Sequence, residues 1–116
     1  MELRYTVIDP TKNITLLVTT PVPRDVQPRV AAELLQREQD AEQVGFAEGL
    51  AAGEPRLQMM GGEFCGNATM SLAALLAFQE NLPDDGEAVY PLEVSGADGI
   101  VNCRIRRSGD VCRGTV

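Results

Sequence analysis

The chain has 116 residues and a formal net charge of −7, with 44% hydrophobic and 23% charged residues. This length corresponds to one domain with a modest core, and the composition is ordinary for a globular fold. Residues 1–99 carry 6 basic and 16 acidic side chains, whereas residues 100–116 carry four arginines and one aspartate. Nucleic-acid phosphates require a basic surface, which a chain as acidic as this one lacks. No nucleic-acid partner is therefore expected.

The residue types that are missing narrow the chemistry further. The chain contains no histidine and three cysteines at irregular spacing. Without histidine, Cys-His and Ser-His pairs are excluded and a zinc site is not expected, which leaves cysteine, carboxylates and backbone dipoles. Three cysteines do not indicate a disulfide framework. The first ten residues show neither the basic start nor the apolar run of a signal peptide, so we expect a cytoplasmic protein.

The first third of the chain predicts a hairpin followed by an amphipathic helix. Residues 3–9 and 14–19 are rich in β-branched side chains and are joined by the turn-forming segment PTKN. Apolar residues then recur at helical spacing over about 26–38, which predicts a surface helix. Asp25 is its expected cap, and Pro28 is tolerated because it falls in the first turn.

The middle of the chain predicts two short strands and a buried helix. Residues 43–54 indicate a strand that leads into a glycine-rich loop, and residues 56–60 indicate another strand. Residues 64–79 contain no charge and are apolar almost all round, which is typical of a buried helix. This segment is too short for a membrane span, which needs about 20 apolar residues, so no membrane partner is expected.

Three further strands are expected near the end of the chain, at residues 88–94, 99–107 and 110–116. The fold class is therefore α+β. We expect a mainly antiparallel β-sheet or barrel wrapped around one central buried helix, with one additional outer helix. The last strand reaches Val116 with no closing element, which suggests a chain that is cut at a domain boundary.

Cys65 is the first candidate for chemistry, because it lies at the expected start of the buried helix between Gly62 and Gly66. Unpaired N–H groups and the positive end of the helix dipole would stabilise a thiolate there and would receive a carboxylate. Asn67 could cap the helix or direct its amide toward a substrate. Free cysteines are also among the most buried residues, so packing in the core is the alternative interpretation.

The other candidates are weaker. Glu63 could orient a substrate ammonium group or act as a second acid/base, and it could equally be a solvated charge at the helix start. Cys103 alternates with apolar neighbours and is expected to face the core, and Cys112 is interpreted in the same way. Asn13 is by default a turn residue.

The segment GGEFCGNATM, residues 61–70, followed by an apolar helix, resembles the first catalytic motif of the diaminopimelate epimerase-like superfamily of cofactor-independent amino-acid racemases and epimerases. The segments DPTKNITLLV, DVQPRVAAELLQRE and LEVSGADGIVNCRI are similar to the first hairpin, the first helix and a later strand pair of that superfamily. The resemblance covers nearly the whole chain. It implies a two-lobed enzyme in which residues 1–116 form the N-terminal lobe, while the second lobe is absent from this chain.

The resemblance also implies a mechanism. Two cysteines face each other across the substrate Cα; one, as a thiolate, removes the α-proton, and the other, as a thiol, protonates the opposite face. Cys65 would be one of the pair. Gly66 and Asn67 would bind the α-carboxylate of a small amino-acid substrate, and Asn13 matches a family asparagine that contacts the substrate. The substrate-binding role considered for Glu63 rests on its position in the loop alone. The resemblance implies neither a cofactor nor a metal.

Some positions depart from the family pattern. Met59 and Met60 stand where the family carries an asparagine, and a family glutamine after the first helix is interpreted as replaced near Glu48. These positions concern the side chain of the substrate, so they favour an amino acid other than meso-diaminopimelate. Cys112 is not expected to be the second cysteine, because it lies in a strand and Arg113 follows it. We expect that cysteine in the missing C-terminal lobe or in a second chain.

Three functions are therefore compatible with the sequence. The first is the N-terminal lobe of an amino-acid racemase or epimerase, inactive or nearly so by itself. The second is an isomerase of the related phenazine-biosynthesis-like branch, in which Glu63 would be the base and Cys65 a bystander. The third is a non-catalytic domain that binds small carboxylates or pairs with itself. An exposed lobe interface would favour self-association, for example as a homodimer.

Overall fold

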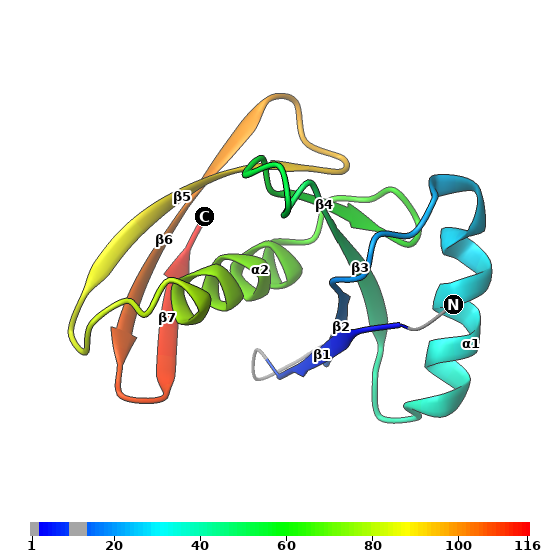
Figure 1. Cartoon of the computed structure of the whole chain (residues 1–116), viewed down its shortest axis with the longest axis horizontal. Helices are drawn as coiled ribbons and strands as arrows, with labels where there is room; N and C mark the ends of the chain where they lie inside the picture. The colour runs from blue at the N-terminus through cyan, green and yellow to red at the C-terminus, as the bar shows by residue number, and fades with distance from the viewer. Residues whose placement is uncertain (1–2, 10–13) are drawn as a thin grey trace.

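In the computed structural model, which describes residues 3–9 and 14–116, a seven-stranded sheet carries one α-helix on each face (Figure 1). The elements in chain order are β1 (Tyr5–Ile8), β2 (Thr15–Val18), the 3-10 turn η1 (Arg24–Val26), α1 (Gln27–Arg37), β3 (Gln43–Glu48), β4 (Arg56–Met59), α2 (Gly66–Gln79), β5 (Glu87–Val94), β6 (Ile100–Ser108) and β7 (Val111–Thr115). The strands lie side by side in chain order. Two neighbouring pairs, β2 with β3 and β4 with β5, are parallel, because α1 and α2 carry the chain back between them. The other pairs are antiparallel.

Strands β2 and β3 are buried on both faces. Leu16 and Val18 of β2, with Val44 and Phe46 of β3, pack on the side covered by α1. Leu17 lies between Leu16 and Val18 and belongs to the core on the opposite side, which is covered by α2. Strands covered on both faces read as continuous apolar runs, which explains why these segments lack an alternating pattern.

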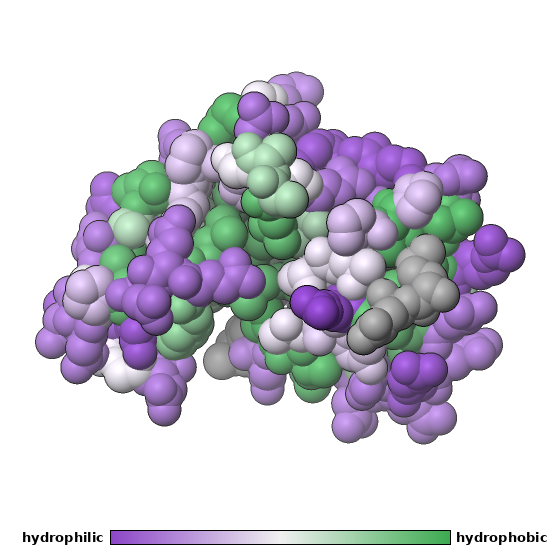
Figure 2. All heavy atoms as spheres, viewed as in Figure 1, coloured by the Kyte–Doolittle hydropathy of each residue, from purple (hydrophilic) through white to green (hydrophobic). Residues whose placement is uncertain are grey.

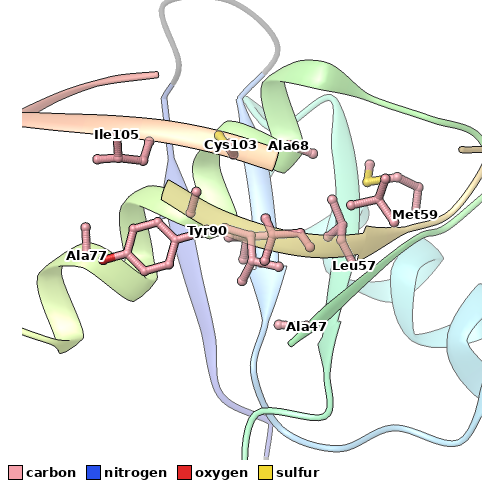
Figure 3. Packing of buried hydrophobic residues seen from close by; sticks show 13 residues of the cluster. Ala47, Leu57, Met59, Ala68, Ala77, Tyr90, Cys103 and Ile105 are labelled. Atoms are coloured by element: carbon pink, nitrogen blue, oxygen red, sulfur yellow. The ribbon is translucent and has the colours of Figure 1, made fainter. Parts of the chain in front are cut away.

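The C-terminal strands are covered on one face only, where α2 packs against β5, β6 and β7. Figure 3 shows Tyr90 from β5 and Cys103 and Ile105 from β6 in this core, together with Ala68 and Ala77 of α2. The residues between them in each strand are exposed or half-buried, which gives the alternation typical of a half-solvated sheet. Among the described residues, no helix is long and apolar enough to cross a membrane.

These observations confirm the α+β class, the outer helix and the central apolar helix. The sheet is open, with β1 and β7 as its edges. A groove of about 620 Å³ runs along α2 between these edges, and its lining includes Ile8, Met70, Phe78 and Cys112. In the view of Figure 2, hydrophobic residues are exposed in the middle of the molecule, and hydrophilic residues cover most of its left and right ends.

The predicted cap of the first helix is wrong. Asp25 lies inside η1, and the N-cap residue of α1 is Val26, without a side-chain capping bond. The chain enters α1 through a 3-10 turn in which Val26 N donates to Pro23 O at 3.0 Å. Val26 therefore already has nearly helical dihedrals. A capping aspartate needs an extended backbone just before the helix, and the 3-10 turn does not provide one. Pro28 does lie in the first turn of α1, as predicted.

Glu48 at the end of β3 is the centre of a polar network that joins the two halves of the sheet. Its carboxylate accepts two hydrogen bonds from Arg24, at 2.7 and 2.8 Å, one from Gln27 at 2.8 Å and one from Arg56 at 3.2 Å. Arg56 also pairs with Glu93 of β5 at 3.2 Å. The hydrogen bond from Arg24 is the main reason that the pKa of Glu48 is lowered to about 2, against the opposing effect of partial burial.

We expect the variant Glu48→Gln to lower the free energy of unfolding near neutral pH by about 1–3 kcal/mol, because Arg24 loses its anionic partner and Arg56 keeps only Glu93. The ordinary pKa of this carboxyl is 4.5 and the folded value is about 2. The ionic contribution is therefore complete above 4.5 and is lost as the pH falls toward 2. Urea unfolding near neutral pH and at about pH 2.5 should show the difference between wild type and variant shrinking in acid.

Glu87→Gln is the matched control for this measurement. Its pair with Arg104 is largely exposed, with 49% and 66% of the side chains accessible. Exposed pairs contribute about 0–1 kcal/mol, so we expect little change at either pH. An effect of Glu48→Gln that is equal at both pH values would contradict the ionic account.

Candidate active site at the start of helix α2

Cys65 is the N-cap residue of α2, with extended dihedrals of φ −135° and ψ 110°. Its backbone carbonyl accepts the first helical hydrogen bond, from Thr69 N at 3.0 Å, and a second from Thr69 Oγ1 at 2.8 Å. Its side chain makes no capping bond. The thiol is thus free for other contacts, and the amides of Gly66 and Asn67 precede the first intrahelical bond, so they can bind an anion.

The half-buried thiol contacts the side-chain amide of Gln43, the first residue of β3. Gln43 Nε2 donates to Cys65 Sγ at 3.3 Å, and the Sγ–H group can donate to Gln43 Oε1 at 3.5 Å. Gln43 Nε2 also donates to the hydroxyl of Thr15, the first residue of β2, at 2.7 Å. In the part of the chain that the structure describes, no charged side chain is bonded to the thiol. Its immediate partner is neutral.

The loop before Cys65 is held from the far end of β5. Ser95 Oγ donates to Glu63 O at 2.7 Å and accepts from Met59 N at 3.0 Å. Gly96 follows with φ +76°, and a Cβ atom built there would lie 2.7 Å from the carbonyl carbon of Glu63 and closer still to the backbone nitrogen of Phe64. Only glycine fits this close approach, so the loop position depends on Gly96.

The structure places the predicted site residues as follows. Gly66 and Asn67 are the first two residues of α2, beside Cys65, and Asn67 is therefore not the cap, because Cys65 occupies that position. Glu63 is exposed, and its carboxylate accepts from Gly61 N at 3.2 Å. Asn13 lies outside the described residues.

The sequence did not indicate Gln43 or Thr15 as site residues. The only signal was a polar residue at the start of each of two apolar strands. Gln43 follows α1 and contacts Cys65. Glu48 is held in the arginine network. That a family glutamine is replaced near Glu48 stays a prediction from the sequence.

The other two cysteines differ from Cys65 in their surroundings. Cys103 is fully buried in the core, as predicted, and burial raises its pKa to about 11. Cys112 is half-buried in the groove beside α2; burial raises its pKa, and the nearby Arg107 opposes that shift. The groove lining does not include residues 61–67, so the groove and the start of α2 are separate features. Within residues 3–9 and 14–116, no three metal-ligating side chains gather into a cluster.

We expect iodoacetamide to alkylate Cys65 first and Cys103 last in the folded protein. Cys103 is inaccessible and mostly protonated, since burial raises its pKa to about 11. Burial also disfavours the thiolate of Cys112. Peptide mass mapping over a time course, with urea-unfolded protein as the control, measures the order. Equal labelling of all three thiols before unfolding would contradict this assignment.

The variant Gly96→Ala should lower the free energy of unfolding by about 3 kcal/mol or more, because the new methyl group meets the loop backbone. It should also change the alkylation rate of Cys65, because the loop that leads to it must move. Gly53→Ala is the matched control: Gly53 has a similar φ of +73°, but no atom lies within 4 Å of its added Cβ. That variant should cost only about 1–2 kcal/mol. Equal losses in both variants would show that the close approach does not matter.

Comparison with known proteins identifies the family. Residues 2–116 match the family profile described as "Histidine racemase CntK N-terminal domain". The chain is 38% identical over 110 residues to a histidine racemase of Fusobacterium nucleatum subsp. nucleatum strain ATCC 23726, and 35% identical over 109 residues to that of strain ATCC 25586. It is 32% identical over 107 residues to a histidine racemase of Staphylococcus aureus strain Mu50.

These alignments cover about nine tenths of this chain, from 89% to 92%, but only 38% to 39% of the relatives. The chain therefore spans about two fifths of the length of the curated relatives it matches. The profile match extends over nearly every residue, from the first hairpin through α2 to β7. The chain belongs to the family of histidine racemase N-terminal domains.

Proposed function

We propose that the protein carrying this chain racemises a free amino acid, with Cys65 as one of two acid/base groups. The observation that carries the proposal is the geometry of Cys65, whose thiol is free of any capping role and stands beside unpaired helix amides. Family membership supports the reaction class, and the name of the curated relatives makes histidine the proposed substrate.

The start of α2 offers what such a reaction requires. The amides of Gly66 and Asn67 would receive the α-carboxylate at the positive end of the helix, which also stabilises negative charge that develops at Cα. The Cys65 thiolate would then remove the α-proton, and a second group would protonate the opposite face. This is the two-base chemistry of the diaminopimelate epimerase-like superfamily, which uses no cofactor, and we propose that the chain belongs there.

We further propose that residues 1–116 form the N-terminal lobe of a two-lobed enzyme and that a second lobe supplies the partner cysteine. The length of the relatives supports this arrangement. Cys103 is buried in the core, and Cys112 lies in strand β7, so neither has the helix-start geometry of Cys65. The substrate would lie between the lobes. Self-association and a cytoplasmic location stay predictions from the sequence.

No observation favours the two other functions. For the phenazine-biosynthesis-like reaction, Glu63 would be the base, but its exposed carboxylate is turned back to the amide of Gly61. A purely binding domain would need the helix amides but not the contact between Gln43 and the thiol. The racemase proposal uses both features.

The test is Cys65→Ser in the full-length protein, with turnover followed as loss of L-histidine by chiral chromatography. Removing one acid/base group should lower kcat about 100- to 10,000-fold. Solvent deuterium incorporation at Cα should fall with it. Cys112→Ser is the control and should retain kcat within about twofold, because serine preserves the size of a side chain that lies outside the proposed site.

Two outcomes would count against the proposal. Full turnover by Cys65→Ser would exclude the cysteine mechanism, and Glu63→Gln would then decide whether the carboxylate acts instead. Binding of histidine without deuterium exchange in the wild type would indicate a binding domain. Other amino acids tested in parallel would show whether histidine is the preferred substrate.

A further inference from the structure

We infer that Gln43 is a positioning residue that serves Cys65 in both of its protonation states, and that Thr15 fixes the Gln43 amide for this purpose. The inference rests on the proposed function, in which the same sulfur must act as a base for one enantiomer and as an acid for the other. It concerns how the thiol is held, and neither residue needs to touch the substrate.

The amide of Gln43 lies side-on to the sulfur. Its nitrogen is 3.3 Å from Cys65 Sγ and its oxygen is 3.5 Å away, so a donor and an acceptor are within reach together. One hydrogen of Nε2 points to Thr15 Oγ1 at 2.7 Å. The second hydrogen remains for the sulfur, because a primary amide carries two.

This arrangement suits both states of the thiol. A thiolate only accepts, and Nε2–H can donate to it; a thiol can donate its S–H to Oε1. In proton removal, the Cα–H bond breaks, its electron pair stays on Cα and the proton forms the S–H bond of Cys65. In the reverse direction the S–H bond breaks and the proton goes to Cα. The amide needs no rotation between these states.

Thr15 keeps the amide in place. It is fully buried and lies directly beside Gln43 in the parallel pairing of β2 with β3. Both residues are the first of their strands, so the backbone fixes their separation. A hydroxyl held in this way restricts the side-chain dihedrals of Gln43, which lowers the entropy lost when the amide contacts the sulfur.

The experiment compares Gln43→Leu and Gln43→Glu in the full-length protein with the wild type. Leucine removes both polar groups, and glutamate keeps the shape but cannot donate to a thiolate. Each should lower kcat about tenfold or more, because a hydrogen bond to a charged group is lost, with KM changed less than about threefold. The rate of Cys65 alkylation at a fixed pH should fall in parallel. Gln36→Leu, at an exposed position of α1, is the matched control and should change neither rate.

Thr15 provides a second pair of variants. Thr15→Val removes the hydroxyl without changing the shape and should lower kcat about threefold or more, whereas Thr15→Ser should restore the rate. Urea unfolding of each variant identifies losses that come from instability alone. If Gln43 and Thr15 serve only the stability of the fold, Gln43→Glu and Thr15→Val will lower the free energy of unfolding while the alkylation rate of Cys65 stays constant. That result would overturn the inference.

The remaining outcomes are also decisive. A rise in KM with unchanged kcat would show that Gln43 binds the substrate and does not position the sulfur, and would overturn the inference. If Cys65→Ser abolishes turnover while both Gln43 variants stay within about twofold of the wild type, only the positioning role falls. If Cys65→Ser is fully active, the proposed function itself falls.

Discussion

The packing of α2 against the sheet is the constraint on which the remaining structure depends. The helix carries no charge, and its buried face includes small residues such as Ala68, Ala73 and Ala77, which let it lie close to the strands. This contact buries the inner face of β5 and β6 and one face of β2. It thereby fixes where the helix begins. The start of α2 lies against the first residues of β2 and β3, so the neighbours of Cys65 are set by the core and not by the loop alone.

The three cysteines show how one fold gives one residue type different roles. Cys103 takes the place of an apolar side chain in the core, and burial raises its pKa. Cys112 covers part of a groove. Cys65 is the cysteine at the start of a helix: its carbonyl accepts the first helical hydrogen bond, and its side chain contacts the amide of Gln43. The side chain of Gln43 offers this sulfur both a donor and an acceptor without burying a second charge beside it.

The sequence was sufficient for the features that are local. The hairpin, the amphipathic helix and the apolar helix follow from patterns within single segments, and Cys65 could be placed because the motif and the helix start are contiguous. The contact of Gln43 with Cys65 could not be predicted, because it requires β2 and β3 to pair in parallel after a crossover helix. The capping prediction for Asp25 was wrong because the chain enters α1 through a 3-10 turn, which overrides the local capping preference.

The site also joins parts of the chain that are far apart in sequence. Gln43, which contacts the thiol, comes from β3 under α1. The loop that carries the thiol is held by Ser95 and fits against Gly96 at the end of β5. The Glu48 network connects the same two regions through Arg56 and Glu93. A shift between them would move the sulfur relative to Gln43 by a comparable amount. A hydrogen bond weakens when its distance or angle departs from the favourable range. The contacts that hold the two regions of the sheet together therefore also help to position the thiol.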